Sequence, residues 1–239
     1  MVLLGVIGML VIPSGNVTRA GRRPAPRAVI PYTSFSFGDI YRGEIISQIF
    51  IIKNEGDADL QIKDFVASCG CQLVRSDKVI PPGKEGTATV EVETISQSGK
   101  IVKTATMQTN DPNLPSIVFT LVANVLQGTP LRRGKFIGPI FVSPDSFLAL
   151  YAPAGKQVAG RVSITADDSP VKVLRVEGAT NHFSTRVEVI EPGRNYNIVI
   201  ESLPTETAGL FREQIRVITD NLLLPAFPIE AALRVMPKQ

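Results

Sequence analysis

The 239-residue chain has 25 Lys and Arg against 22 Asp and Glu, a formal net charge of +3, with 44% hydrophobic and 20% charged residues. This composition excludes a mainly disordered chain, and so small and mixed a charge does not indicate a nucleic-acid partner. One His, two Cys and no Trp leave most metal-dependent and triad enzymes without their residues. The length fits one or two domains.

Residues 1–32 form a signal-like apolar segment followed by a spacer rich in Pro and Arg. Met1 to Ile12 holds only apolar residues and Gly. As a helix this run would span roughly 18 Å, which is short of a bilayer core of about 30 Å but typical of a secretory signal. No Lys or Arg precedes it. We expect an exported protein, with an N-terminal membrane association if the segment is retained.

The chain repeats itself at an offset of 110 residues. Val79-Ile80-Pro81-Pro82-Gly83 returns as Val189-Ile190-Glu191-Pro192-Gly193, and Thr109-Asn110-Asp111 returns as Thr219-Asp220-Asn221. Two copies of one module near 100 residues each indicate tandem domains, since solenoids need more and shorter repeats. We expect the copies at 33–126 and 138–236, with a linker at 127–137.

Each copy shows short runs in which polar and apolar residues alternate. Thr87 to Glu93 and Arg161 to Thr165 are examples, and Pro-Gly and Asn-Asp turns separate the runs. Such a pattern predicts an all-β fold of two tandem immunoglobulin-like antiparallel β-sandwiches. The core expected for the first copy is Phe35, Phe37, Ile49, Ile51, Leu60, Ile62, Val90, Val92, Phe119 and Leu121.

The linker contains Gly128 and Pro130, which favour a hinge. Arg132, Arg133 and Lys135 follow. They would suit an anionic partner, but the small net charge favours a solvated linker.

Several motifs of the first copy share one order and spacing. They are Phe35-Ser36-Phe37-Gly38, Asn54-Glu55-Gly56, Ser68-Cys69-Gly70-Cys71, Pro82-Gly83 and Thr109-Asn110-Asp111-Pro112. In these motifs the copy resembles the bacterial "domain of unknown function 1573" family, which is similar to the immunoglobulin-like domains of major sperm protein and of ciliary and centrosomal scaffolds. The resemblance implies a bacterial, often exported sandwich domain and no established reaction.

The family pattern is incomplete in this chain. Gln72 stands where the family usually has Thr, and the second copy has Ala179 and Asn181 at the positions of the two cysteines. The second copy therefore resembles the family only as a degenerate relative.

Cys69 and Cys71 are the candidate site. Three interpretations stay open: the two thiolates bind a soft metal such as Cu(I), they form a strained and readily reduced disulfide, or they pack in a tight turn that Gly70 permits. A loop disulfide or a structural pair is favoured over a metal site.

Other chemistry-bearing residues have plainer interpretations. His182 would have to meet Cys69 across two domains to form a catalytic pair. Asp57, Asp59, Asp167 and Asp168 lie beside turns, where Asp caps the backbone. We therefore expect no enzyme and no cofactor.

The function predicted is a non-enzymatic, exported or envelope-associated protein that binds a protein partner and no nucleic acid. The alternative is a copper-binding or thiol redox protein that uses Cys69 and Cys71. A pilus chaperone, which also pairs two such domains, is the weakest candidate because it rests on fold analogy alone.

Overall fold

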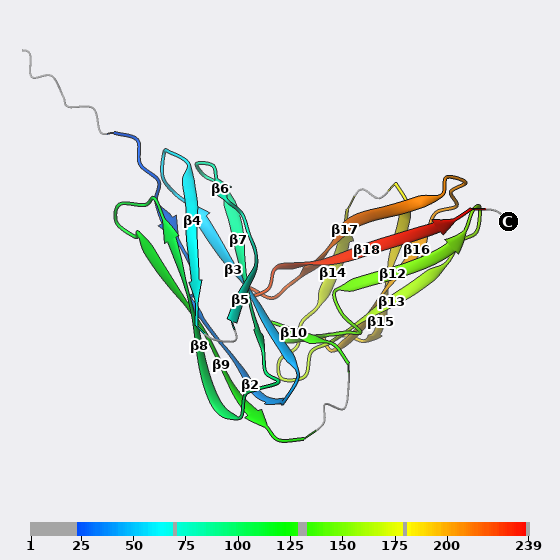
Figure 1. Cartoon of the computed structure of the whole chain (residues 1–239), viewed down its shortest axis with the longest axis horizontal. Coiled ribbons are helices and arrows are strands. Elements are labelled where there is room, and N and C mark those ends of the chain that lie inside the picture. The colour runs from blue at the N-terminus through cyan, green and yellow to red at the C-terminus, as the bar shows by residue number, and fades with distance from the viewer. Residues whose placement is uncertain (1–22, 69–70, 129–132, 179–180, 238–239) are drawn as a thin grey trace, which may run out of the picture.

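The computed structural model describes residues 23–68, 71–128, 133–178 and 181–237, and within these ranges it contains strands and no helix. The all-β fold of two tandem immunoglobulin-like sandwiches is confirmed (Figure 1). No helix in the described ranges is long and apolar enough to cross a membrane. The expected signal segment, at residues 1–22, lies outside them.

The first sandwich is built from nine of the described strands. They are β1 (Ala28–Val29), β2 (Ser34–Tyr41), β3 (Ile45–Asn54), β4 (Leu60–Ala67), β5 (Cys71–Ser76), β6 (Val79–Ile80), β7 (Glu85–Glu93), β8 (Gly99–Thr109) and β9 (Ser116–Leu126). The strands β2, β9, β8, β4 and β6 form a five-stranded sheet in that order.

The second sandwich follows a short strand, β10 (Lys135–Ile137). Its strands are β11 (Ile140–Ser143), β12 (Phe147–Pro153), β13 (Ala159–Thr165), β14 (Val173–Glu177), β15 (Phe183–Glu191), β16 (Asn195–Ser202), β17 (Gly209–Thr219) and β18 (Ala226–Met236). A four-stranded sheet has the order β12-β18-β17-β14.

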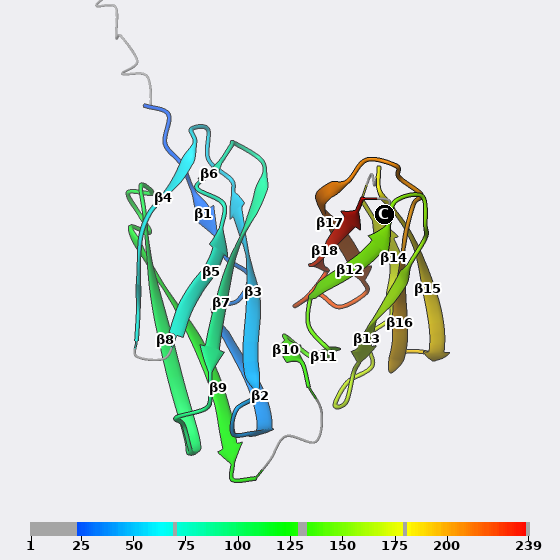
Figure 2. The same cartoon turned by 45° about the vertical axis from the view of Figure 1, so that its right-hand side comes forward.

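One sheet runs through both sandwiches. Its order is β15-β16-β13-β11-β10-β3-β7-β5, with β1 added beside β3. The strand β10 pairs with β3 in parallel and with β11 in antiparallel orientation, and Figure 2 shows β10 and β11 between the two sandwiches. The two domains are therefore joined by backbone hydrogen bonds as well as by the chain.

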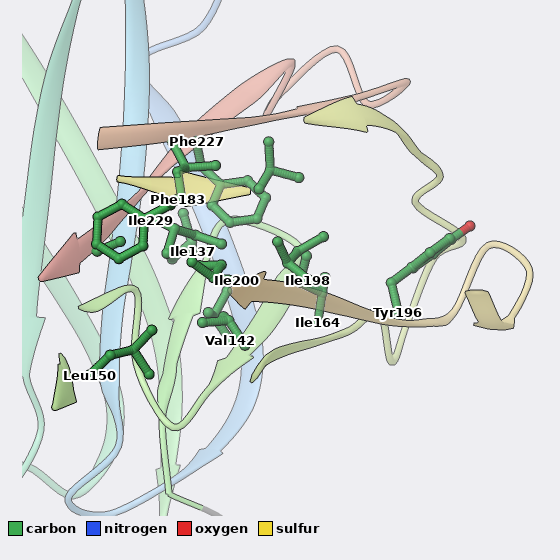
Figure 3. Close-up of a cluster of buried hydrophobic side chains, with 14 of the residues drawn as sticks. Ile137, Val142, Leu150, Ile164, Phe183, Tyr196, Ile198, Ile200, Phe227 and Ile229 are labelled. Atoms are coloured by element: carbon green, nitrogen blue, oxygen red, sulfur yellow. The ribbon is translucent and has the colours of Figure 1, made fainter. Parts of the chain in front are cut away.

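The strand β10 also contributes to both hydrophobic cores. Phe136 packs against the core of the first sandwich, whereas the next residue, Ile137, belongs to the core of the second (Figure 3). Successive side chains of a strand point to opposite faces of a sheet. The two cores consequently lie on opposite faces of the shared sheet.

The first core contains most of the residues predicted for it. Those that are buried there are Phe37, Leu60, Ile62, Val90, Val92, Phe119 and Leu121, while Phe35 packs partly buried against them. The prediction was wrong for Ile49 and Ile51. The inward positions of β3 are Ile46, Phe50 and Ile52, whereas Ile49 joins the second core and Ile51 lines the space between the sandwiches.

The error in β3 has a physical cause. The outer face of β3 is covered by the second sandwich, so apolar residues occupy both faces of the strand. A strand that is buried on both sides has a continuous apolar sequence and loses the alternation that reveals its register.

The segment expected to be a hinge ends in paired structure. Residues 129–132 lie outside the described ranges, but Lys135–Ile137 pair with two strands. Lys135 is also not solvated: its side chain is 17% exposed, and its Nζ lies 3.5 Å from Glu91 and 3.4 Å from Asp145.

Candidate functional site

Cys71 is the described half of the cysteine pair. It begins β5, lies opposite Val92 of β7, and packs partly buried against the first core. Its amide donates to the Ser68 carbonyl at 3.0 Å, and its Sγ lies 3.6 Å from Ser68 Oγ. It is a free thiol whose pKa is raised by burial, although the Ser68 hydroxyl and the charge of Lys103 oppose that shift.

These contacts are those of a packing residue at a tight turn. A protonated, half-buried thiol is a poor nucleophile and a poor metal ligand. Cys69 and Gly70 lie outside the described residues, so a metal site or a disulfide at Cys69 and Cys71 stays a prediction. Elsewhere in the described ranges, no three His, Cys, Asp or Glu side chains are arranged to hold a metal ion.

The other candidate residues have local structural partners. His182 Nδ1 lies 2.7 Å from Glu213 Oε1, and the ring stacks on Phe211, all within the second sandwich. Asp111 is 2% exposed and accepts hydrogen bonds from the amides of Ala28 and Asn113.

A groove between the sandwiches is the largest feature suited to binding. Two adjoining hollows, of about 330 and 400 Å³, share Ile49, Arg75, Thr89 and Pro228 in their lining. We call them together the inter-sandwich groove. One wall is the outer face of β3, β7 and β5, and the other is formed by β12, β17 and β18. Sites for extended ligands are often found at such domain interfaces.

The groove combines apolar and charged side chains. Ile51 and Phe147 contribute apolar surface, and Phe147 is 44% exposed. Near its base lie Lys135 and its two carboxylate partners. Towards the rim, Arg75 Nη1 lies 3.9 Å from Glu230 Oε1 of the second sandwich. Both are well exposed, so this ion pair adds little stability.

Polar contacts on the first sandwich fix the position of a loop from the second. The Tyr32 hydroxyl donates to the Leu223 carbonyl at 2.5 Å, and Gln48 Nε2 donates to the same carbonyl at 3.1 Å. Gly138 donates its amide to the Ser47 carbonyl at 2.8 Å. Gln48 is fully buried, and among the described atoms its Oε1 lacks a hydrogen-bond partner. These contacts hold the groove walls in one relative position.

Sequence reasoning did not find this groove. Its residues come from β3, β5, β7, β10, β12, β17 and β18, and no local motif links them. The one available signal was the unbroken apolar run in β3, which shows that a second surface covers its outer face.

Comparisons with solved structures return low overall similarity. A protein of unknown function from Porphyromonas gingivalis W83 is 12% identical, with 87% of this chain and 99% of that chain covered and a TM-score of 0.34. An ASH/PapD-like domain of human CEP192 is 11% identical, covering 53% of this chain and 100% of that domain, with a TM-score of 0.38. These values carry no information about function. No curated protein matches the sequence.

The family comparison is more specific. Residues 29–125 match the model described as "Protein of unknown function (DUF1573)". This range contains all the motifs on which the sequence resemblance rested, and it coincides with the first sandwich. The first sandwich of the chain is therefore a domain of the DUF1573 family.

Proposed function

We propose that the protein is a non-enzymatic interaction protein of the bacterial cell envelope, which binds an extended segment of a protein partner in the inter-sandwich groove. The observation that carries the proposal is the shared sheet, which holds two sandwiches at a fixed angle and so keeps the groove open. A preformed site binds more tightly than one that must be assembled, because less conformational freedom is lost on binding.

The lining of the groove supports a polypeptide as the ligand. Apolar side chains of Ile51, Phe147 and Pro228 suit alternate side chains of an extended chain, and charges of both signs suit its polar positions. The strands β5 and β12, which contribute Arg75 and Phe147, are each the last described strand of their sheet. A partner strand can extend such an edge by backbone hydrogen bonding.

Site-specific photo-crosslinking in the native host tests the groove. A photoreactive residue is placed at Thr87 or Gln214, which line the groove, and as controls at Ser184 or Thr207, which are exposed elsewhere. We expect one protein to be trapped at both groove positions and at neither control. Trapping at none of the four positions, or equally at all four, would refute a groove ligand.

Charge reversal provides a second readout of the same binding. Arg75→Glu should reduce the crosslinking yield from Thr87, because it places a carboxylate beside Glu230 at the rim. Lys156→Glu, in an exposed turn of the second sandwich, is the matched control and should leave the yield unchanged.

The location in the envelope rests on the apolar segment at Met1–Ile12. Fractionation of the host and an intact mass of the recovered protein test it. Export predicts recovery outside the cytoplasm, and cleavage of the segment would lower the mass. A full-length chain confined to the cytoplasm would contradict this part of the proposal and leave the groove untouched.

A further inference from the structure

The five-stranded sheet of the first sandwich has an exposed outer face without ionisable side chains. Its first row crosses three strands, with Val66 of β4, Thr106 of β8 and Val118 of β9 as register partners. Two of these side chains are valines with large exposed fractions, 65% for Val66 and 49% for Val118.

Two further rows extend the face. One contains Thr104 of β8, Thr120 of β9 and Ser34 of β2, and the other contains Val102, Val122 and Ser36 on the same strands. Val102 is 58% exposed. We call these three rows the neutral face. Charged residues appear only beyond the third row, where Lys100 and Asp39 flank Asn124.

The same sandwich shows how a surface of this kind is used. The outer face of its other sheet carries Ile49, Ile51, Thr87 and Thr89, which are also β-branched and uncharged. The second sandwich covers part of that face and buries Ile49 in its core. A β-branched, uncharged sheet surface is thus a packing surface at one place in this chain already.

We propose that the neutral face packs against the neutral face of a second copy of this chain around a two-fold axis. Charge selects this occupant over the other sheet faces of the molecule. At the corresponding positions of the second sandwich, 110 residues later, Val102 becomes Arg212, Thr106 becomes Arg216 and Thr120 becomes Glu230, all exposed. Packing the neutral face on such residues would remove charges from water without partners.

The neutral face meets itself without that penalty, and a two-fold arrangement uses one patch on both copies. Four strands about 4.8 Å apart and three rows about 6.8 Å apart give a footprint on the order of 400 Å² per copy. Such an area lies at the low end of specific interfaces, where complexes are weak and reversible. The dimer should therefore have a Kd in the micromolar range or weaker.

Sedimentation velocity of the full chain over a range of concentrations tests the dimer. The mass should rise with concentration from 25.8 kDa towards twice that value. Thr120 lies in the middle row, so Thr120→Glu and Thr120→Lys each bring like charges together near the axis. Each variant alone should weaken self-association at least tenfold, and an equimolar mixture of the two should restore it. Thr207→Lys, in an exposed loop of the second sandwich, should associate as the wild type does.

The mixed sample separates this proposal from its competitors. A wild type that stays monomeric, charged variants that associate like the wild type, or a mixture that behaves like its separate components would each overturn the two-fold interface. Association through the apolar N-terminal segment would give the second of these results. Circular dichroism of each variant confirms that it is folded. Arg75→Glu should leave association unchanged, because the groove lies on the other sheet.

Discussion

The two sandwiches preserve the same strands at the same spacing. The strands β8 and β9 reappear exactly 110 residues later as β17 and β18, and β7 and β16 begin 110 residues apart. The turn between the paired strands is preserved as well: Thr109 and Thr219 each donate a side-chain hydrogen bond to the carbonyl of a leucine five residues later. The repeat seen in the sequence is therefore a repeat of strands and turns.

The outer faces of the two copies have diverged. The neutral face of the first sandwich corresponds to a face of the second that carries Arg212, Arg216, Glu230 and Arg234. Part of that charged face lines the inter-sandwich groove. Internal packing constrains both copies alike, whereas each outer face is free to acquire its own contacts. The comparison predicts that core substitutions act alike in the two copies and surface substitutions do not.

The largest effect should come from removing a buried ring. Phe119 is fully buried and stacks on Phe50 with ring centroids 4.3 Å apart. Phe119→Ala should lower the free energy of unfolding by about 3–5 kcal/mol. Ile229→Ala, at the matching position of the second copy, should cost about 2–5 kcal/mol. Chemical denaturation measures both.

Hydrogen exchange shows whether the cores are coupled. Because β10 pairs with both halves of the shared sheet, Phe119→Ala should also reduce the protection of β16 in the second sandwich. Unchanged protection there would show that the sandwiches unfold independently.

A pair of glycines tests the position of β10. Gly134 and Gly128 have nearly the same backbone conformation, with φ of +148° and +144°. A Cβ on Gly134 would lie 2.2 Å from the Val142 carbonyl oxygen, whereas on Gly128 it would meet only the Tyr41 ring at 3.3 Å. Both Ala variants carry backbone strain of about 1–3 kcal/mol. Gly134→Ala should lose clearly more stability in thermal melts, and equal losses would mean that β10 and β11 are not held as described.

The turns offer a smaller and more selective comparison. Asp111 accepts one amide on each carboxylate oxygen, from Ala28 and Asn113, whereas Asn221 accepts from Leu223 and Leu224 through one oxygen. Asp111→Asn should cost about 1–3 kcal/mol, because either orientation of the amide turns an NH₂ group towards a buried N–H. Asn221→Asp, which keeps an acceptor in place, should cost less in the same urea titration. A reversed order would contradict the difference between the turns.

The repeat carried most of the fold, because turn residues and alternating strands leave local signals. Other features depend on segments far apart in sequence. A domain start at residue 138 separates Ile137 from its register partner Ile140, since a three-residue strand paired across domains has no signature of its own. The groove is hidden for the same reason. For the cysteine motif, the surroundings of Cys71 depend on how β5 packs on the core, and spacing alone does not reveal that.

The smallest effect concerns the contact that joins the sandwiches at Tyr32. Burial raises the pKa of the Tyr32 hydroxyl above its ordinary value of 10.0, while the hydrogen bond with Gln48 opposes the shift. The folded state thus favours the protonated form more than the unfolded state does. The resulting stability is fully present below pH 10 and is lost as the pH rises through the folded-state pKa.

Tyr32→Phe should cost about 1 kcal/mol at neutral pH, because it removes the donor to the Leu223 carbonyl. The difference in stability between wild type and variant should then shrink above pH 10. Tyr151→Phe is the matched control, since Tyr151 is 63% exposed on β12 and should change neither quantity. Urea titrations at pH 7 and at several values above pH 10 measure both differences. A constant difference between wild type and Tyr32→Phe across this range would show that the hydroxyl does not help to hold the second sandwich against the first.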